Sequence, residues 1–124
     1  MARVIVVTNN PLLKNLKEVE VCYQSTSILK VMEKARKMVC RGYQLLSHPL
    51  NGNWQMNASP YKTLILERTG EELDSKSVLM LEKGFYWAQE LASSNKKPEE
   101  WPVKVQYDFQ MIDEDILKNA LLGL

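Results

Sequence analysis

Hydrophobic and polar residues alternate along the chain in a way that predicts strands interleaved with amphipathic helices. Residues 3–8, RVIVVT, form a continuous run rich in β-branched side chains. Such a run is typical of a strand that is buried on both faces, as in a sheet covered by helices. Apolar runs at 19–23, 43–46 and 61–68 predict three further strands.

Helical spacing and capping residues predict the helices between these strands. Pro11 follows Asn9 and Asn10, either of which can cap a short helix. A longer helix is predicted after Ser25, Thr26 or Ser27 and is expected to end at Gly42, and another is predicted after Asp74. The expected inner faces are Ile28, Met32, Ala35 and Val39 in the first long helix, and Val78, Leu81, Phe85, Ala88 and Leu91 or Ala92 in the second.

The segment 103–111 has a pattern that fits two structures. Five apolar residues alternate with polar ones, which favours a strand with one polar face: Val103, Val105, Tyr107, Phe109 and Met111. A helix that uses Val103, Tyr107 and Met111 stays open. The last stretch is predicted to be a helix capped by Asp113.

The order of elements predicts one α/β domain over residues 1–124, with a mainly parallel sheet of about five strands in a three-layer, Rossmann-like arrangement. Ligands of such sheets bind at the carboxyl ends of strands. Two connections are therefore candidate sites: residues 8–11, and the long polar segment that leads through 47–62.

Composition narrows the function classes. The chain has 124 residues, of which 45% are hydrophobic and 25% charged, as in a folded globular protein. A net charge of +1 gives no electrostatic field that would draw the protein to nucleic acid or membranes.

The N-terminal apolar run is too short for a signal peptide, and no stretch is long enough to span a bilayer, so we expect a cytoplasmic protein. Cys22 and Cys40 are expected to be reduced, with a single disulfide as the alternative.

The TNNP turn at residues 8–11 offers two amide side chains beside a predicted helix start. Free N–H groups at a helix start can hold a carboxylate or phosphate, so Asn9 and Asn10 are candidate ligand-binding residues. A plain helix cap is nevertheless the favoured interpretation of this stretch, with ligand binding as the alternative. The absence of a glycine-rich phosphate loop disfavours a standard dinucleotide or ATP site.

His48 is the only histidine and hence the natural general acid or base if the protein is an enzyme. A structural or ligand-orienting hydrogen bond is the favoured role, since no activated nucleophile is recognisable. One histidine without metal-ligand spacing makes a metal site improbable. Tyr61 and Lys62 enter the next predicted strand, where Lys62 can neutralise an anion, and Asn57 offers a further amide.

Trp54 and Met56 are unusual in a polar connection. Exposed aromatic and flexible apolar side chains often mark a contact surface, although these two can equally form a small core for the loop itself. They are the candidate interaction residues.

Three stretches together resemble a known family: TNNP, GYQLLSHPLNGNWQMNASPYKTLIL from Gly42 to Leu66, and WPVKVQYDFQMIDEDILKNAL. They are similar to the GrdX family, small proteins encoded beside the glycine, sarcosine and betaine reductase genes of amino-acid-fermenting anaerobes. The positions that match the family's central block are His48, Pro49, Leu50, Gly52, Asn57, Pro60, Tyr61 and Lys62. Gln55 departs from it, because it replaces a lysine. The resemblance implies a cytoplasmic accessory role near a reductase complex, without that complex's cofactors.

Three functions follow as hypotheses. The first is an accessory domain that binds a small anionic or zwitterionic metabolite between residues 8–11 and 47–62. The second is an interaction or assembly factor that docks on a reductase subunit through Trp54 and Met56. The third is a nucleotide-related hydrolase or transferase that uses His48.

Overall fold

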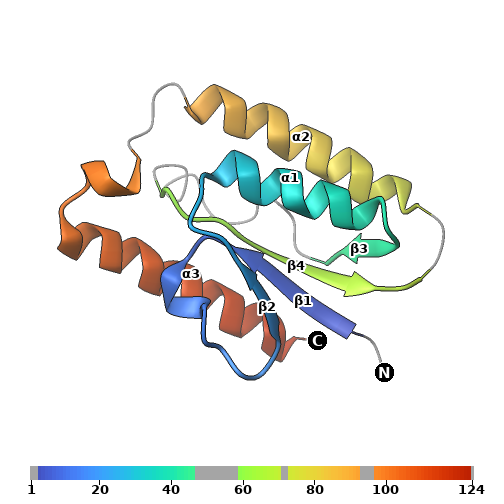
Figure 1. Cartoon of the computed structure of the whole chain (residues 1–124), viewed down its shortest axis with the longest axis horizontal. Coiled ribbons are helices and arrows are strands. Elements are labelled where there is room, and N and C mark those ends of the chain that lie inside the picture. Colours follow the sequence, from blue (N-terminus) through green and yellow to red (C-terminus); the bar gives the residue numbers. More distant parts are fainter. Residues whose placement is uncertain (1–2, 47–58, 71–72, 93–96, 124) are drawn as a thin grey trace.

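The computed structural model describes residues 3–46, 59–70, 73–92 and 97–123 of the chain. These residues form one mixed sheet with helices on both faces (Figure 1). The strands are β1 (Arg3–Thr8), β2 (Glu20–Tyr23), β3 (Tyr43–Leu45) and β4 (Thr63–Arg68), and they lie in the order β2-β1-β4-β3. All four fall where the apolar runs predicted them.

The expected sheet of about five mainly parallel strands is wrong in number and direction. Only β1 and β2 run parallel, whereas β4 is antiparallel to both β1 and β3. No helix lies between β3 and β4 in the described part of the chain, and an antiparallel pair does not need the helical crossover that a parallel pair requires. The described architecture is therefore α/β and layered, but not a clear Rossmann fold.

Two helices pack side by side on one face of the sheet (Figure 1). Helix α1 (Ile28–Val39) begins where the Ser27 hydroxyl accepts the N–H of Lys30, at 3.3 Å. Helix α2 (Ser75–Ala92) begins where Asp74 accepts the N–H of Ser77, at 3.1 Å. Gly42 has φ 99°, a left-handed conformation that glycine adopts without strain. These caps and the end of α1 agree with the sequence prediction.

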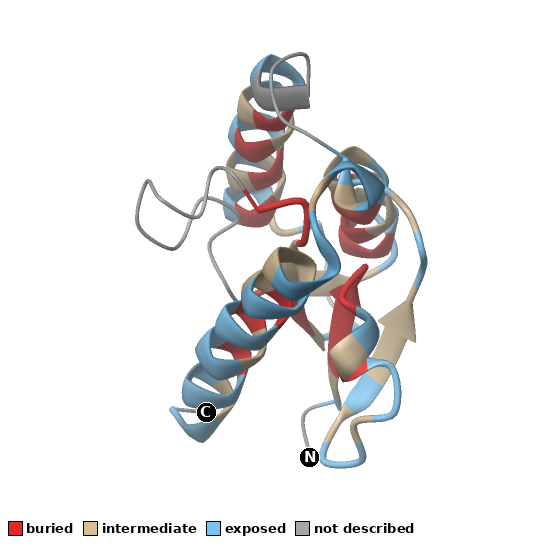
Figure 2. Ribbon diagram, turned by 90° about the vertical axis from the view of Figure 1, so that its left-hand side faces the viewer, coloured by how far each residue is buried: buried red, intermediate tan, exposed pale blue. Residues whose placement is uncertain are grey.

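The inner faces of α1 and α2 build the larger core. It contains twelve buried residues, including Leu64 and Leu66 of β4, Met32 and Ala35 of α1, and Leu81 of α2. All five are less than 2% exposed, and burial of each large side chain contributes about 1.5–3 kcal/mol. Figure 2 shows the buried residues on the inward sides of the helices.

The opposite face of the sheet is covered by a short 3-10 helix, η1 (Pro11–Leu13), and by α3 (Val103–Leu122) (Figure 1). A second 3-10 turn, η3 (Pro98–Glu100), precedes α3. The core on this side has four buried apolar residues: Val6, Leu13, Ile65 and Leu117.

The favoured strand at 103–111 is wrong, because this segment is the first half of α3. Its helix begins after Pro102 and runs through Asp113, so Asp113 lies inside one helix and does not cap another. The open helical alternative is right about the type of structure, yet its proposed inner face is not buried. Val103 is 80% exposed and Tyr107 50% exposed, while the helix buries Gln110, Asp113 and Leu117.

Cys22 and Cys40 are both free thiols, as expected.

Candidate functional site

The ends of β1 and β4 form the scaffold of the candidate site. Thr8 and Thr63 are register partners in the antiparallel pair, so the residues just after β1 lie beside those just before β4. Asn9 donates its backbone N–H to the carbonyl of Lys62 at 3.4 Å, and its Oδ1 accepts the N–H of Lys62 at 2.8 Å. The two sequence regions singled out as candidate sites therefore meet here.

The Asn9 side chain joins three segments. Its Nδ2 donates to the carbonyl of Thr26 at 2.8 Å and to the carbonyl of Pro60 at 3.0 Å. Since Thr26 precedes α1 and Pro60 precedes β4, one buried amide fixes the start of a helix against two strand ends. The resulting arrangement is held by directional bonds rather than by apolar contact alone.

Asn10 acts as the helix cap and also links η1 to α3. Its Oδ1 accepts the N–H of Leu12 at 3.0 Å, which caps η1. Its Nδ2 donates to the carbonyl of Gln110 and to Oδ2 of Asp113, both at 2.9 Å. All of its amide groups are thus engaged within the protein, and the side chain is fully buried.

A chain of hydroxyl groups ends on the same carboxylate. The N–H of Asn10 donates to Oγ1 of Thr8 at 2.9 Å, and the hydroxyls of Thr8 and Thr63 are 2.7 Å apart. Thr63 donates to Oδ2 of Asp113 at 2.5 Å. Each hydroxyl has one proton, and Thr63 uses its proton to donate to Asp113. Thr8 must therefore donate the hydrogen bond between the two threonines.

Burial sets the protonation chemistry of this network. It raises the pKa of Asp113 above its usual range, although hydrogen bonds from Thr63 and Asn10 and the charge of Lys62 act in the opposite direction. Burial likewise lowers the pKa of Lys62, partly offset by the charge of Asp113. None of the direct ion pairs among the described residues joins these two groups, so their attraction acts over a longer distance.

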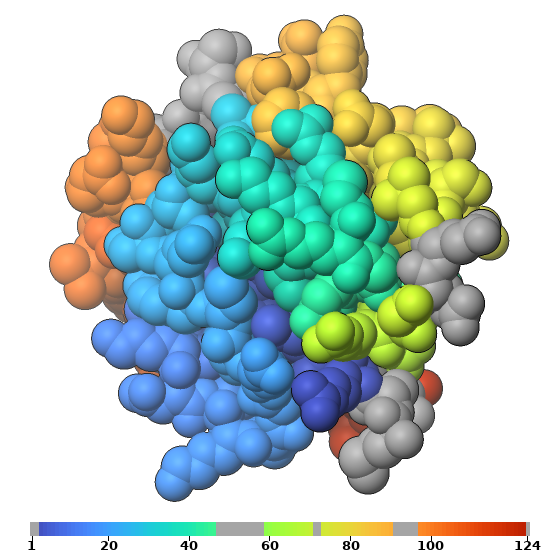
Figure 3. Space-filling view, turned by 45° about the vertical axis from the view of Figure 1, so that its right-hand side comes forward, coloured from blue at the N-terminus to red at the C-terminus, as the bar shows by residue number. Residues whose placement is uncertain are grey.

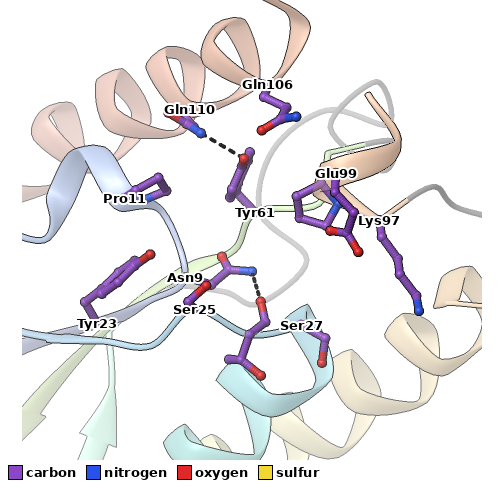
Figure 4. Close-up of a pocket in the computed structure, with 12 residues that line it drawn as sticks. Asn9, Pro11, Tyr23, Ser25, Ser27, Tyr61, Lys97, Glu99, Gln106 and Gln110 are labelled. Atoms are coloured by element: carbon purple, nitrogen blue, oxygen red, sulfur yellow. Dashed lines mark hydrogen bonds between the residues drawn. The ribbon is translucent and has the colours of Figure 1, made fainter. Parts of the chain in front are cut away.

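A pocket of about 660 Å³ opens beside this scaffold. Figure 4 shows that its walls come from the turn after β1, the segment before α1, the entry to β4, and the start of α3 with η3. The polar wall includes Asn9, Ser25, Ser27, Tyr61, Gln106 and Gln110, and the charged residues are Lys97 and Glu99. Its volume suits a small organic ligand.

Tyr61 provides the hydroxyl of this pocket. Nε2 of Gln110 donates to Oη of Tyr61 at 2.8 Å, as the dashed line in Figure 4 marks. The tyrosine oxygen therefore accepts this bond and keeps its own hydrogen for a second partner. Tyr61 can donate that hydrogen to an anionic or carbonyl oxygen in the pocket.

The structure brings some of the predicted site residues together and separates others. Asn9 and Tyr61 line the pocket, whereas Asn10 and Lys62 do not line it. Instead, Nζ of Lys62 lies 6.0 Å from the centre of the Trp87 ring on α2, within the range of a cation–π contact. The other predicted residues, His48, Trp54, Met56 and Asn57, lie outside the described residues, and the roles given to them stay predictions.

Sequence reasoning missed the contribution of α3. Gln106, Gln110 and Asp113 are spaced by four and three residues, which places them on one side of a helix. Interpreted as a helix, 103–113 would have shown this polar stripe. Ser25 and Ser27 were identified only as caps, since nothing local to them indicates a pocket.

Within the described part of the chain, no group of three histidine, cysteine, aspartate or glutamate side chains is arranged to hold a metal ion. None of the helices described there is both long and apolar enough to cross a membrane.

Comparison with known proteins gives one family. No curated protein sequence and no solved structure matches the chain. A family model described as GrdX-like protein matches residues 5–122, a range that includes the whole scaffold from Thr8 to Asp113. The chain therefore belongs to the GrdX-like protein family.

Proposed function

We propose that this GrdX-like protein binds a small anionic or zwitterionic metabolite in the pocket beside Asn9 and Tyr61, as an accessory protein of a glycine, sarcosine or betaine reductase system. The observation that carries the proposal is that Asn9 and Tyr61, from the two connections selected in the sequence, line one pocket together with the start of α1. The reductase association rests on the family alone.

The start of α1 supplies the attraction for a negative group. Ser25, Thr26 and Ser27 line the pocket immediately before the helix. The first N–H groups of a helix have no partner within it, and they carry partial positive charge. A carboxylate or phosphate oxygen placed there accepts hydrogen bonds from these groups and from Tyr61.

The charged residues of the opposite wall suit a ligand with both signs of charge. Lys97 and Glu99 both line the pocket and are exposed to solvent. Glu99 can attract an ammonium group, while Lys97 can add to the attraction for the negative group. The hydrogen bonds of Asn9 already hold the wall formed by the start of α1 and the entry to β4. A ligand therefore does not lose binding free energy by ordering that wall.

The test is a thermal-shift screen against glycine, sarcosine, betaine, acetyl phosphate, phosphate, nucleosides and nucleotides. A ligand at a hundred times its dissociation constant adds about 2.7 kcal/mol, which raises the unfolding midpoint by several degrees. Tyr61→Phe should lose most of the ligand-induced shift, whereas Tyr86→Phe, at a residue that is 66% exposed on α2, should keep it.

The measured quantity is the increment caused by the ligand, because Tyr61→Phe also leaves the Gln110 donor unpaired and lowers the starting midpoint. Equal increments in the two variants with glycine, sarcosine or betaine would reject the pocket. No increment with any compound would reject this ligand class.

Docking on a reductase subunit is supported as a second candidate by the outer side of α3. Tyr107, Met111, Ile112 and Ile116 are all exposed there. Exposed apolar groups gathered on one element often mark a contact surface. Purified reductase subunits should bind the natural chain and Leu79→Ser on α2, but should lose affinity for a Tyr107→Ser, Met111→Ser double variant. Unchanged affinity of the double variant would remove α3 from the interface.

A further inference from the structure

We infer that a second pocket, at the other end of the sheet, binds the phosphate group of a small organic phosphate. This inference is independent of the metabolite site proposed above. The pocket has a volume of about 500 Å³ and will be called the cationic pocket. Its lining residues are Ile5, Glu20, Val21, Cys22, Lys34, Met38, Arg41, Tyr43 and Arg68.

The sheet register explains why these residues meet. Arg68 pairs with Tyr43 on β3 and with Arg3 on β1. Side chains alternate between the faces of a strand, so Arg68 lies on the same face as Leu64 and Leu66, beneath α1. Figure 3 shows this side of the molecule, where the start of β1 is visible between β2, α1 and the end of β4.

The cations of the pocket come from three separate places in the fold. Lys34 belongs to α1, Arg41 lies in the turn that follows it, and Arg68 is the last residue of β4. Their backbones are therefore fixed relative to one another by the helix and the sheet. A ligand does not need to gather them from a mobile segment.

The three cations of the pocket differ from the other cations of α1 in their ion pairing. Lys30 and Lys37 each lie 3.8 Å from a carboxylate oxygen of Glu33, and Arg36 lies 3.3 Å from Glu82. In contrast, no ion pair among the described residues includes Lys34, Arg41 or Arg68. The described carboxylates therefore leave these three cations of the pocket without an ion-pair partner.

The charge balance selects the ligand class. Three positive groups face one carboxylate, that of Glu20, so the lining has a surplus of two positive charges. A phosphate monoester carries close to two negative charges and presents several oxygens that arginine guanidinium groups bind in pairs. A monocarboxylate offers half of that charge, and Glu20 opposes it.

The remaining surface suits the organic part of such a ligand. Ile5 and Met38, which are both buried, and the ring of Tyr43 supply the apolar part of the lining. Small-molecule pockets commonly combine an apolar wall with a few charged groups, at volumes of about 300–1,000 Å³. The cationic pocket falls within that description.

Titration calorimetry of the full chain with inorganic phosphate and with AMP tests the inference. We expect AMP to bind with millimolar or tighter affinity, and inorganic phosphate more weakly because it lacks the organic part. Arg41→Gln and Arg68→Gln should each weaken AMP at least about tenfold, which corresponds to about 1.4 kcal/mol. Lys37→Gln removes a positive charge of α1 that lies outside the pocket, so it should leave the affinity for AMP unchanged.

Three outcomes would overturn the inference. The first is no heat of binding with either probe. The second is equal weakening by Arg68→Gln and Lys37→Gln, which would indicate a general effect of net charge. The third is arginine-dependent binding of a short single-stranded oligonucleotide without binding of AMP, which would assign the cations to nucleic acid.

Two controls accompany these measurements. Circular dichroism checks that each variant is folded, and Tyr61→Phe should bind AMP with unchanged affinity because the two pockets are separate.

Discussion

The two faces of the sheet are built on different physical principles. The face under α1 and α2 has a core cluster of twelve buried residues, whereas the face under η1 and α3 has a cluster of four. The second face instead buries polar groups, including Thr8, Asn10, Gln110 and Asp113. Apolar burial contributes free energy without direction, while hydrogen bonds fix relative position. The first face therefore stabilises the fold, and the second determines how α3 sits beside the pocket.

The largest expected effect tests the apolar face. Leu66→Ala removes a fully buried side chain of β4 and leaves a cavity, so the free energy of unfolding should fall by about 2–5 kcal/mol. Urea denaturation measures this change, with Leu79→Ala on the exposed side of α2 as the control. A loss below that caused by Asp113→Ala would reverse the comparison between the two faces.

Asp113→Ala tests the polar face and should have an intermediate effect. It leaves the Nδ2 group of Asn10 and the hydroxyl of Thr63 without their acceptor, which costs about 1–3 kcal/mol. Asp113→Asn keeps an acceptor oxygen and removes a charge that burial disfavours, so its cost in urea denaturation should be smaller. Equal losses in both variants would show that the charge, and not the acceptor, holds α3.

The pH dependence of stability isolates the same carboxyl group. The folded pKa of Asp113 is raised above its usual value of 3.8, so the folded chain holds this proton more tightly than the unfolded chain does. Its contribution to the free energy of unfolding is then greatest below pH 3.8 and is lost as the pH rises through the folded pKa. The advantage of the natural chain over Asp113→Asn should fall with rising pH, and an advantage that grows instead would contradict the raised pKa.

The smallest expected effect concerns the ion pair between α1 and α2. Nη1 of Arg36 lies 3.3 Å from Oε1 of Glu82, and both side chains are about half exposed. Glu82→Gln should therefore lower the free energy of unfolding by less than about 1 kcal/mol. A loss as large as that of Leu66→Ala would mean that the helices are joined by charge rather than by their apolar faces.

The apolar face was largely predictable because its signals are local. Met32, Ala35 and Val39 recur at helical spacing, and they are all buried as expected. Ser27 and Asp74 cap their helices through bonds to residues three positions later. A window of a few residues contains both partners of each such interaction.

The polar face was not predictable in the same way, because its partners are far apart in sequence. Asn10 and Asp113 are 103 positions apart, and the sequence around each of them gives no indication that they form a hydrogen bond. The alternation at 103–111 favoured a strand, yet the segment is helical and its buried side is polar. The tertiary environment outweighed this local preference, because Gln110 and Asp113 find hydrogen-bond partners in Asn10, just after β1, and in Tyr61 and Thr63, at the entry to β4.

By itself, the sequence determined the α/β class, the positions of the four strands, the caps of α1 and α2, and the two connections at the candidate site. Only the tertiary structure decided the strand directions, the helical state of α3, and which residues line each pocket. The physical reason is the range of the forces involved. Periodicity and capping act between near neighbours, whereas strand pairing, buried hydrogen bonds and charge clusters depend on residues that the chain brings together only when it folds.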